Sequence, residues 1–146
     1  MFGDFIRSLT APDPAPLGET DARLALTALL VRLARADGDY AKIEISTIDH
    51  VISERYGLSA QDAQLVRAEA ETLEEEAPDT VRFTRAIKEA VPYEDRESVI
   101  EAMWKVGLAD GSRDQLEDRL VRLVAPMLGV NDRDSARARQ RAARTE

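Results

Sequence analysis

The chain has 146 residues, of which 44% are apolar and 33% charged, with a formal net charge of −8 and no cysteine. This length is typical of one domain, and the acidic balance argues against a nucleic-acid partner, because phosphates repel a negative surface. The lack of cysteine excludes disulfides, zinc–thiolate sites and thiol nucleophiles, and a single histidine, His50, excludes a histidine-rich metal site.

The N-terminal residues 1–18 are predicted to be an arm and a linker outside the fold. A short amphipathic start is followed by three prolines, Pro12, Pro14 and Pro16. The start lacks the basic region and long apolar stretch of a secretory signal, so we expect a cytoplasmic protein. No apolar run approaches the ~20 residues that span a bilayer, so we expect no transmembrane segment.

From Thr20 onward the apolar residues recur with helical spacing, which predicts an all-α fold. We expect a single-domain bundle of about seven helices, with the helical domain at 19–132 and an Arg-rich C-terminal helix or tail at 133–146. The predicted helices lie near 20–36, 45–56, 59–76, 81–91, 99–108 and 116–128, and from about 132 a polar helix frays into the tail. The first of them is apolar on most of its faces, which indicates a central position.

Leucines define the expected buried faces of the later helices. Leu65 and Leu73 mark the inner face of the helix at 59–76, for which Ser59 is the predicted N-cap. Leu120 and Leu123 do the same for the helix at 116–128. The run 69–79 carries six acids and no base, which is typical of a solvated face. Tyr93, Met103 and Trp104 are expected either in the core or along a groove.

The sequence contains an internal repeat. Residues 33–44 read LARADGDYAKIE and residues 106–117 read VGLADGSRDQLE, so that a shift of 73 aligns two Ala-Asp-Gly motifs and the glutamate that follows each. Both copies follow an apolar helix and precede an amphipathic one. This pattern predicts two pseudo-repeated helix–loop–helix units.

The repeated loops carry oxygen ligands suited to calcium or magnesium. If the two loops meet in space, the acids of the first copy would face those of the second. The candidate metal ligands are Asp37, Asp39, Glu44, Asp110, Asp114 and Glu117. The loops are not EF-hands, because apolar or basic residues occupy the earlier ligand positions.

A structural interpretation of the same loops needs no metal. Gly38 and Gly111 would end helices with positive φ, and Asp39 would cap the helix that follows. Glu44 lies close to a helix N-terminus, where the helix dipole favours negative charge.

On these two Ala-Asp-Gly motifs, each followed by an acid, the chain resembles the TerB-like tellurite-resistance family over roughly residues 20–130. That family includes the N-terminal domain of the DjlA co-chaperone. The resemblance implies an all-helical bundle with a divalent-metal or partner-binding role. Reduction of tellurite itself would need thiols or a redox cofactor, and the sequence has no cysteine and no cofactor motif.

The sequence therefore predicts a non-enzymatic TerB-like module that binds a divalent cation through the repeated loops, in stress response or scaffolding. The alternative is a metal-independent, co-chaperone-like interaction domain with purely structural loops and a helical groove for a protein partner. No catalytic residue is predicted.

Overall fold

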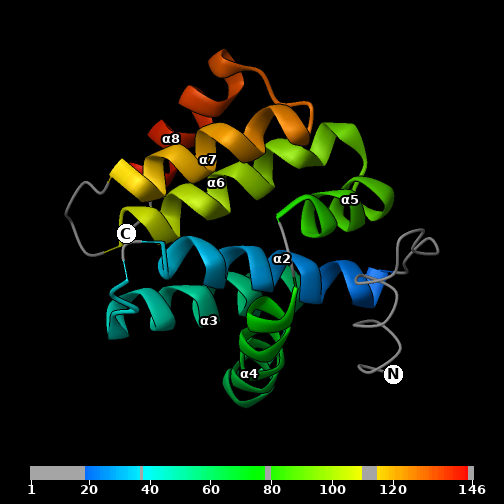
Figure 1. Ribbon diagram of the computed structural model, residues 1–146, viewed down its shortest axis with the longest axis vertical. Coiled ribbons are helices and arrows are strands. Elements are labelled where there is room, and N and C mark those ends of the chain that lie inside the picture. The colour runs from blue at the N-terminus through cyan, green and yellow to red at the C-terminus, as the bar shows by residue number, and fades with distance from the viewer. Residues whose placement is uncertain (1–18, 37, 78–79, 110–114, 145–146) are drawn as a thin grey trace.

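The computed structural model describes residues 19–36, 38–77, 80–109 and 115–144, and these residues form an all-α bundle (Figure 1). The predicted arm at 1–18 lies outside them. The described part of the chain has seven α-helices, one short 3₁₀ helix and no strand. They are α2 (Glu19–Ala34), α3 (Lys42–Tyr56), α4 (Ala60–Glu76), α5 (Thr80–Ala90), η1 (Tyr93–Asp95), α6 (Arg96–Gly107), α7 (Gln115–Met127) and α8 (Asp132–Arg144).

Helices α3 and α7 end with the same kind of local signal, and α4 and α8, which follow them, begin with the same kind of cap. Gly57 and Gly129 both have a positive φ, of 64° and 78°, which a residue with a side chain rarely adopts. Two residues later a polar side chain caps the next helix: Ser59 Oγ accepts the N–H of Asp62 at 3.1 Å, and Asn131 Oδ1 accepts the N–H of Asp134 at 2.8 Å. The predicted cap at Ser59 is confirmed.

Each repeat consists of three helices, α2–α3–α4 and α6–α7–α8. In both repeats the third helix packs on the first, α4 on α2 and α8 on α6. The first two helices of each repeat also contact those of the other, because α2 packs on α6 and α7, and α3 packs on α6. Exchanging the two repeats maps these contacts onto each other, whereas the packing of α3 on α4 has no equal between the described residues of α7 and α8.

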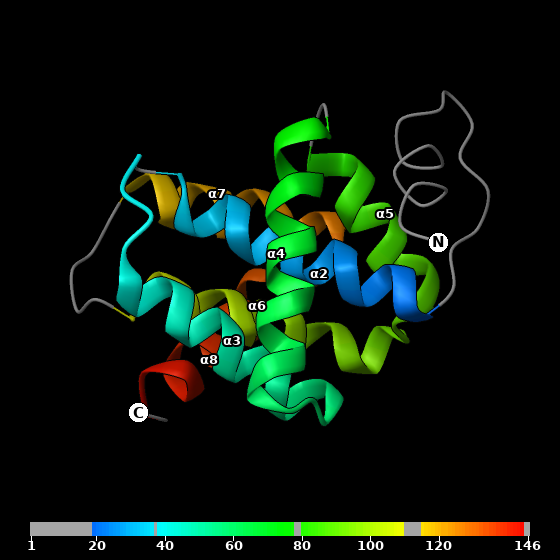
Figure 2. The ribbon, with the colours of Figure 1, turned by 90° about the horizontal axis from the view of Figure 1, so that it is seen from below.

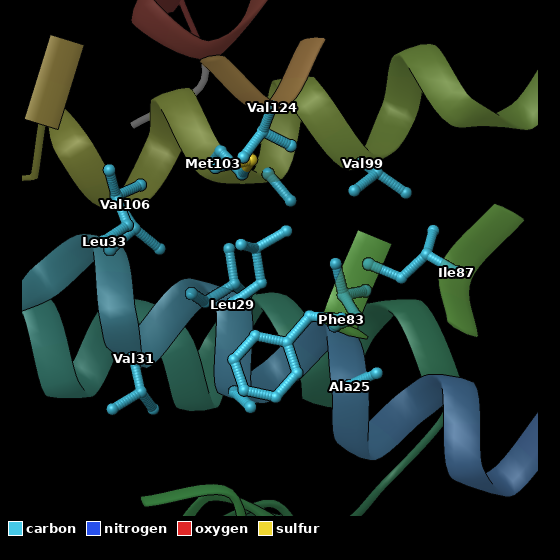
Figure 3. Close-up of a cluster of buried hydrophobic side chains, with 14 of the residues drawn as sticks. Ala25, Leu29, Val31, Leu33, Phe83, Ile87, Val99, Met103, Val106 and Val124 are labelled. Atoms are coloured by element: carbon cyan, nitrogen blue, oxygen red, sulfur yellow. The ribbon is translucent and has the colours of Figure 1, made fainter. Parts of the chain in front are cut away.

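The first helices of the repeats run side by side in the same direction (Figures 1 and 2). Near their C-terminal ends Leu33 on α2 and Val106 on α6 point toward each other (Figure 3), and these two positions are equivalent under the shift of 73. A Cβ built on Gly107 would lie 4.0 Å from Leu33 Cδ2, which is ordinary van der Waals contact. The two repeats therefore meet at equivalent positions.

Helix α2 is buried along most of its length, as predicted. Its core side chains include Leu26, Leu29, Leu30 and Leu33, each at most 1% exposed. It lies between α6 and α7 on one side and α3 and α4 on the other (Figures 1 and 2). Phe83 and Ile87 from α5 close the remaining side of this core (Figure 3).

The Arg-rich C-terminal helix differs from the expected fraying tail, because α8 is helical to Arg144 and packs along α6. Small residues, Ser135, Ala138 and Ala142, form its buried face. Two of its arginines pair with acids of α6: Arg141 Nε lies 2.6 Å from Glu101 Oε1, and Arg137 Nε lies 3.6 Å from Glu97 Oε1. Burial of small residues and ion pairing, rather than a leucine-rich face, hold this helix.

Two leucines expected in the core are on the surface. Leu65 on α4 is 58% exposed and Leu123 on α7 is 52% exposed, although both fit the helical apolar pattern. The buried face of α4 is formed by Ala63, Ala70 and Leu73 instead. Tyr93 is also exposed, whereas Met103 and Trp104 are core residues, so these three side chains do not line a common groove.

The connection between the repeats is fixed by Arg96. Its guanidinium donates hydrogen bonds to the carbonyl oxygens of Lys88, Val91 and Leu128, at 3.1–3.4 Å. These oxygens lie at the C-terminal ends of α5 and α7, where the helix dipole favours a positive charge.

None of the described helices combines the length and apolar character that a membrane-spanning segment needs.

Replacing Leu29 by Ala is expected to lower the free energy of unfolding by about 2–5 kcal/mol, because a fully buried leucine leaves a cavity. The matched control is Leu65→Ala, which should change stability by no more than ~0.5 kcal/mol because this side chain is exposed. Urea unfolding followed by circular dichroism measures both, and equal losses would contradict the assigned core.

Candidate functional site

The first Asp-Gly loop follows the C-terminal end of α2. Gly38 has φ of +82°, and its N–H donates to the carbonyl of Arg35 at 3.0 Å. A positive φ at this position favours glycine, so the predicted role of Gly38 in ending the helix is confirmed. Gly111, its counterpart in the second loop, lies outside the described residues.

Glu44 is the most buried of the predicted ligands that the structure describes, with 1% of its surface exposed. It occupies the first turn of α3, and its Oε1 accepts the N–H of Ala41 at 3.2 Å. Ala41 is the N-cap of α3, so the prediction that Asp39 caps this helix is wrong. A carboxylate in this position stabilises the helix through the hydrogen bond and the helix dipole.

The structure places only part of the predicted ligand set. Asp39 is exposed in the first loop, and Glu44 is buried in the first turn of α3. Asp37, Asp110 and Asp114 lie outside the described residues, and Glu117 belongs to α7 without a described side chain. Among the residues whose side chains are described, no three or more potential ligands gather around one point.

The ends of α2 and α6 bring the starts of the two loops to the same end of the bundle (Figures 1 and 2). Ala36 and Ala109, the alanines of the two Ala-Asp-Gly motifs, each follow the last turn of these neighbouring helices. Leu33 and Val106 point toward each other near these helix ends (Figure 3). The first residues of the two motifs therefore arise from adjacent helix ends.

Tyr40 anchors the first loop to α4. Its hydroxyl donates to Glu71 Oε2 at 2.6 Å, and the guanidinium carbon of Arg35 lies 4.8 Å from the centre of its ring. Burial and the hydrogen bond to Glu71 raise the pKa of Tyr40, so the phenol stays protonated and remains a donor. Arg67 lies between Glu71, at 3.0 Å, and Asp49, at 2.6 Å, and so joins α4 to α3.

A second set of contacts joins the end of α2 to α4. Glu74 receives Arg32 Nε at 3.1 Å on one oxygen and Arg35 Nη1 at 2.7 Å on the other. Arg32 also donates to the carbonyl oxygens of Glu74 and Ala77, which end α4. The acidic run at 69–79 is therefore not simply a solvated face, because Glu71 and Glu74 pair with cations inside the fold.

A groove of about 780 Å³ opens beside the start of the second loop. It lies among α3, the end of α6 and α8, and Ile43 at its edge is 49% exposed. Leu108 and Ala142 supply further apolar surface. His50 lies on its wall, where its Nε2 is 3.2 Å from Glu54 Oε1. The sequence predicts a helical groove but not its position, because the groove is assembled from three helices that are distant in the chain.

The architecture defines a class of protein: an all-helical bundle of two pseudo-repeats, each with an Asp-Gly loop after its first helix. A family model described as tellurite resistance protein TerB matches residues 23–140, which is most of the chain. The chain therefore belongs to the TerB family, as the repeated motifs predicted. The match begins in α2 and ends within α8, so it spans both repeats. No curated protein and no solved structure gives a significant match.

Replacing Glu74 by Ala is expected to destabilise the protein by about 1–3 kcal/mol, because two partly buried guanidinium groups lose their acceptor. The neighbouring Glu75→Ala is the matched control, since the Glu75 side chain is 69% exposed and 3.6 Å from Arg35. It should cost less than ~0.5 kcal/mol. Thermal unfolding measures both, and a Glu75 variant as unstable as the Glu74 variant would contradict the assigned pairing.

Proposed function

We propose that the chain is a non-enzymatic TerB-type module of the cytoplasm that binds one divalent cation, calcium or magnesium, between its two Asp-Gly loops. Its role would be in stress response or scaffolding. The observation that supports this proposal is the placement of α2 and α6, which end side by side, with Leu33 and Val106 pointing toward each other (Figure 3). Both copies of the acidic motif follow from those neighbouring ends.

The chemistry of the proposed site follows from the charges of the two loops. Carboxylates about 5 Å apart repel each other by about 3 kcal/mol at an effective dielectric constant of ~20. A hard divalent cation offsets this repulsion through oxygen ligands, which calcium accepts in flexible geometry and magnesium in a near-octahedral one. The six proposed ligands are Asp37, Asp39, Glu44, Asp110, Asp114 and Glu117.

Glu44 also stabilises the first turn of α3, so a test of cation binding must preserve this structural role. Because its Oε1 accepts the Ala41 N–H, removing the whole side chain would weaken α3 whether or not a cation binds. Glutamine keeps an oxygen that accepts this hydrogen bond and removes only the charge. Glu44→Gln therefore separates the structural role of the residue from its proposed role as a ligand.

The test is thermal unfolding of the full chain in chelator, calcium or magnesium. A cation at ~100 times its dissociation constant adds about 2.7 kcal/mol, which is a rise of several degrees in Tm. The double variant E44Q/E117Q should keep a Tm close to the parent in chelator and lose the cation-dependent rise. E76Q, which neutralises an exposed acid on α4, should keep that rise. No rise with either cation in the parent protein would refute the proposal.

The second candidate is a metal-independent interaction domain, and the groove beside Ile43 favours it. In that case the loops are structural, Glu44 only accepts the N–H of the N-cap residue Ala41, and cations leave the Tm of every variant unchanged. Ile43→Ser should then be as stable as the parent, because a half-exposed isoleucine kept for a partner contributes little to the folded monomer. A large loss of stability in this variant would assign Ile43 to the fold instead.

A further inference from the structure

The outer face of α4 carries an exposed leucine among acids. Leu65 is 58% exposed, and Asp62, Glu69, Thr72 and Glu76 share its face at helical spacing. We call Asp62, Leu65, Glu69 and Glu76 the acidic stripe. An exposed leucine on a helix whose other face is already packed adds nothing to the monomer core, and it is well placed to contact another molecule.

The outer face of α7 also carries an exposed leucine among charged residues, but there the charges are positive. Leu123 is 52% exposed, and Arg119, Arg122 and Pro126 are exposed on the same face at spacings of three and four residues. We call Arg119, Arg122, Leu123 and Pro126 the basic stripe. Neither arginine has a hydrogen bond or ion pair to another residue in the described part of the chain, so both charges face solvent.

The two stripes lie on opposite sides of the molecule. Helix α4 is at one end of the longest axis of the bundle and α7 is toward the other, as Figure 1 and the view from below in Figure 2 both show. No single molecule can bring its own stripes together, whereas the acidic stripe of one copy can meet the basic stripe of the next.

We propose that the acidic stripe on α4 docks against the basic stripe on α7 of a second copy of this chain. In this contact Leu65 packs near Leu123, and Glu69 and Glu76 face Arg119 and Arg122. The two leucines bury apolar area and the opposite charges set the orientation.

Charge complementarity favours a second copy over an anionic lipid surface as the occupant. A protein with a net charge of −8 is repelled overall by anionic lipid, so a bilayer would attract only the basic stripe. The partner must instead present acids around an exposed apolar residue on a surface the size of one helix, and α4 has those properties.

The contact joins two different surfaces, and this determines how copies of the chain associate. A contact between two different surfaces does not close on itself, so copies add one after another and the mean mass rises with concentration. Helices of 17 and 13 residues, about 25 and 20 Å long, bury a small area, so the association is weak. It is also sensitive to salt, because the charges are exposed.

The experiment is sedimentation equilibrium of the full chain over a range of concentrations. The weight-average mass should rise with concentration in ~0.05 M salt and return to the monomer value in ~0.5 M salt, where screening acts over a few ångströms. R119E/R122E and E69K/E76K should each remain monomeric at low salt, with unchanged circular dichroism and Tm. An equimolar mixture of the two variants should associate again, because an acidic surface then meets a basic one.

The loss of association expected for E69K/E76K distinguishes docking of the two stripes from a general effect of net charge. E69K/E76K brings the net charge closer to zero, so a protein limited only by its charge would associate more, not less. The matched controls reverse two exposed charges outside the stripes: E54K/E94K for the acids and K42E/R144E for the bases. Both controls should associate at least half as strongly as the parent.

Three outcomes overturn the proposal. They are a parent chain that is monomeric at every concentration in low salt, association that neither stripe variant reduces, and a mixture of the two variants that stays monomeric. A flotation assay with vesicles of anionic and neutral phospholipid is run in parallel. If the parent binds these vesicles, R119E/R122E does not, and no self-association occurs, the basic stripe belongs to a lipid surface and the proposal is wrong.

Discussion

The fold depends on enclosing α2, which has almost no polar face. Leu26 and Leu30 lie on one face of the helix and Leu24 and Val31 lie on the opposite face, and each of these side chains is at most 6% exposed. A helix of this kind is stable in water only when neighbours cover it on every side. Helices α3 to α7 all contact it, so the second repeat is part of the enclosure of the first and the two do not form separate domains. The adjacent ends of α2 and α6 are a direct result of this constraint.

Much of this architecture follows from the sequence because it rests on local signals. The helix boundaries follow from apolar periodicity, the cap at Ser59, and the glycines at positions that require a positive φ. Burial of particular residues is harder to predict, since it depends on which helix a face meets. Leu65 and Leu123 fit the apolar pattern as well as the buried leucines do, yet no neighbouring helix covers them. Helix α8 shows the reverse case, because alanines and arginines gave little sign of its packing against α6.

The sequence predicts which residues form the two loops of the candidate site, but only part of the structural roles of those residues. The shared Asp-Gly and glutamate pattern correctly identified both the family and the loops. It placed Glu44 at the start of the helix but predicted the cap at Asp39, whereas Ala41 is the N-cap and its N–H donates to Glu44. The contacts of Tyr40 and Glu74 are long-range, and spacing along one chain carries no information about pairs separated by thirty or more residues.

The charges that hold the third helix of each repeat are opposite in sign. In the first repeat α4 brings Glu74 to Arg32 and Arg35 at the end of α2, and in the second α8 brings Arg137 and Arg141 to the acids of α6. A chain with two similar halves risks pairing a helix with the wrong half while it folds. In the register of the shift of 73, α8 docked on α2 would place Arg137 and Arg141 against Leu24 and Ala28, which offer no acceptor. Helix α4 docked on α6 would leave Glu74 with Lys105 in place of Arg32 and Arg35. The positions of these charges thus distinguish the correct pairing of helices from the exchanged one.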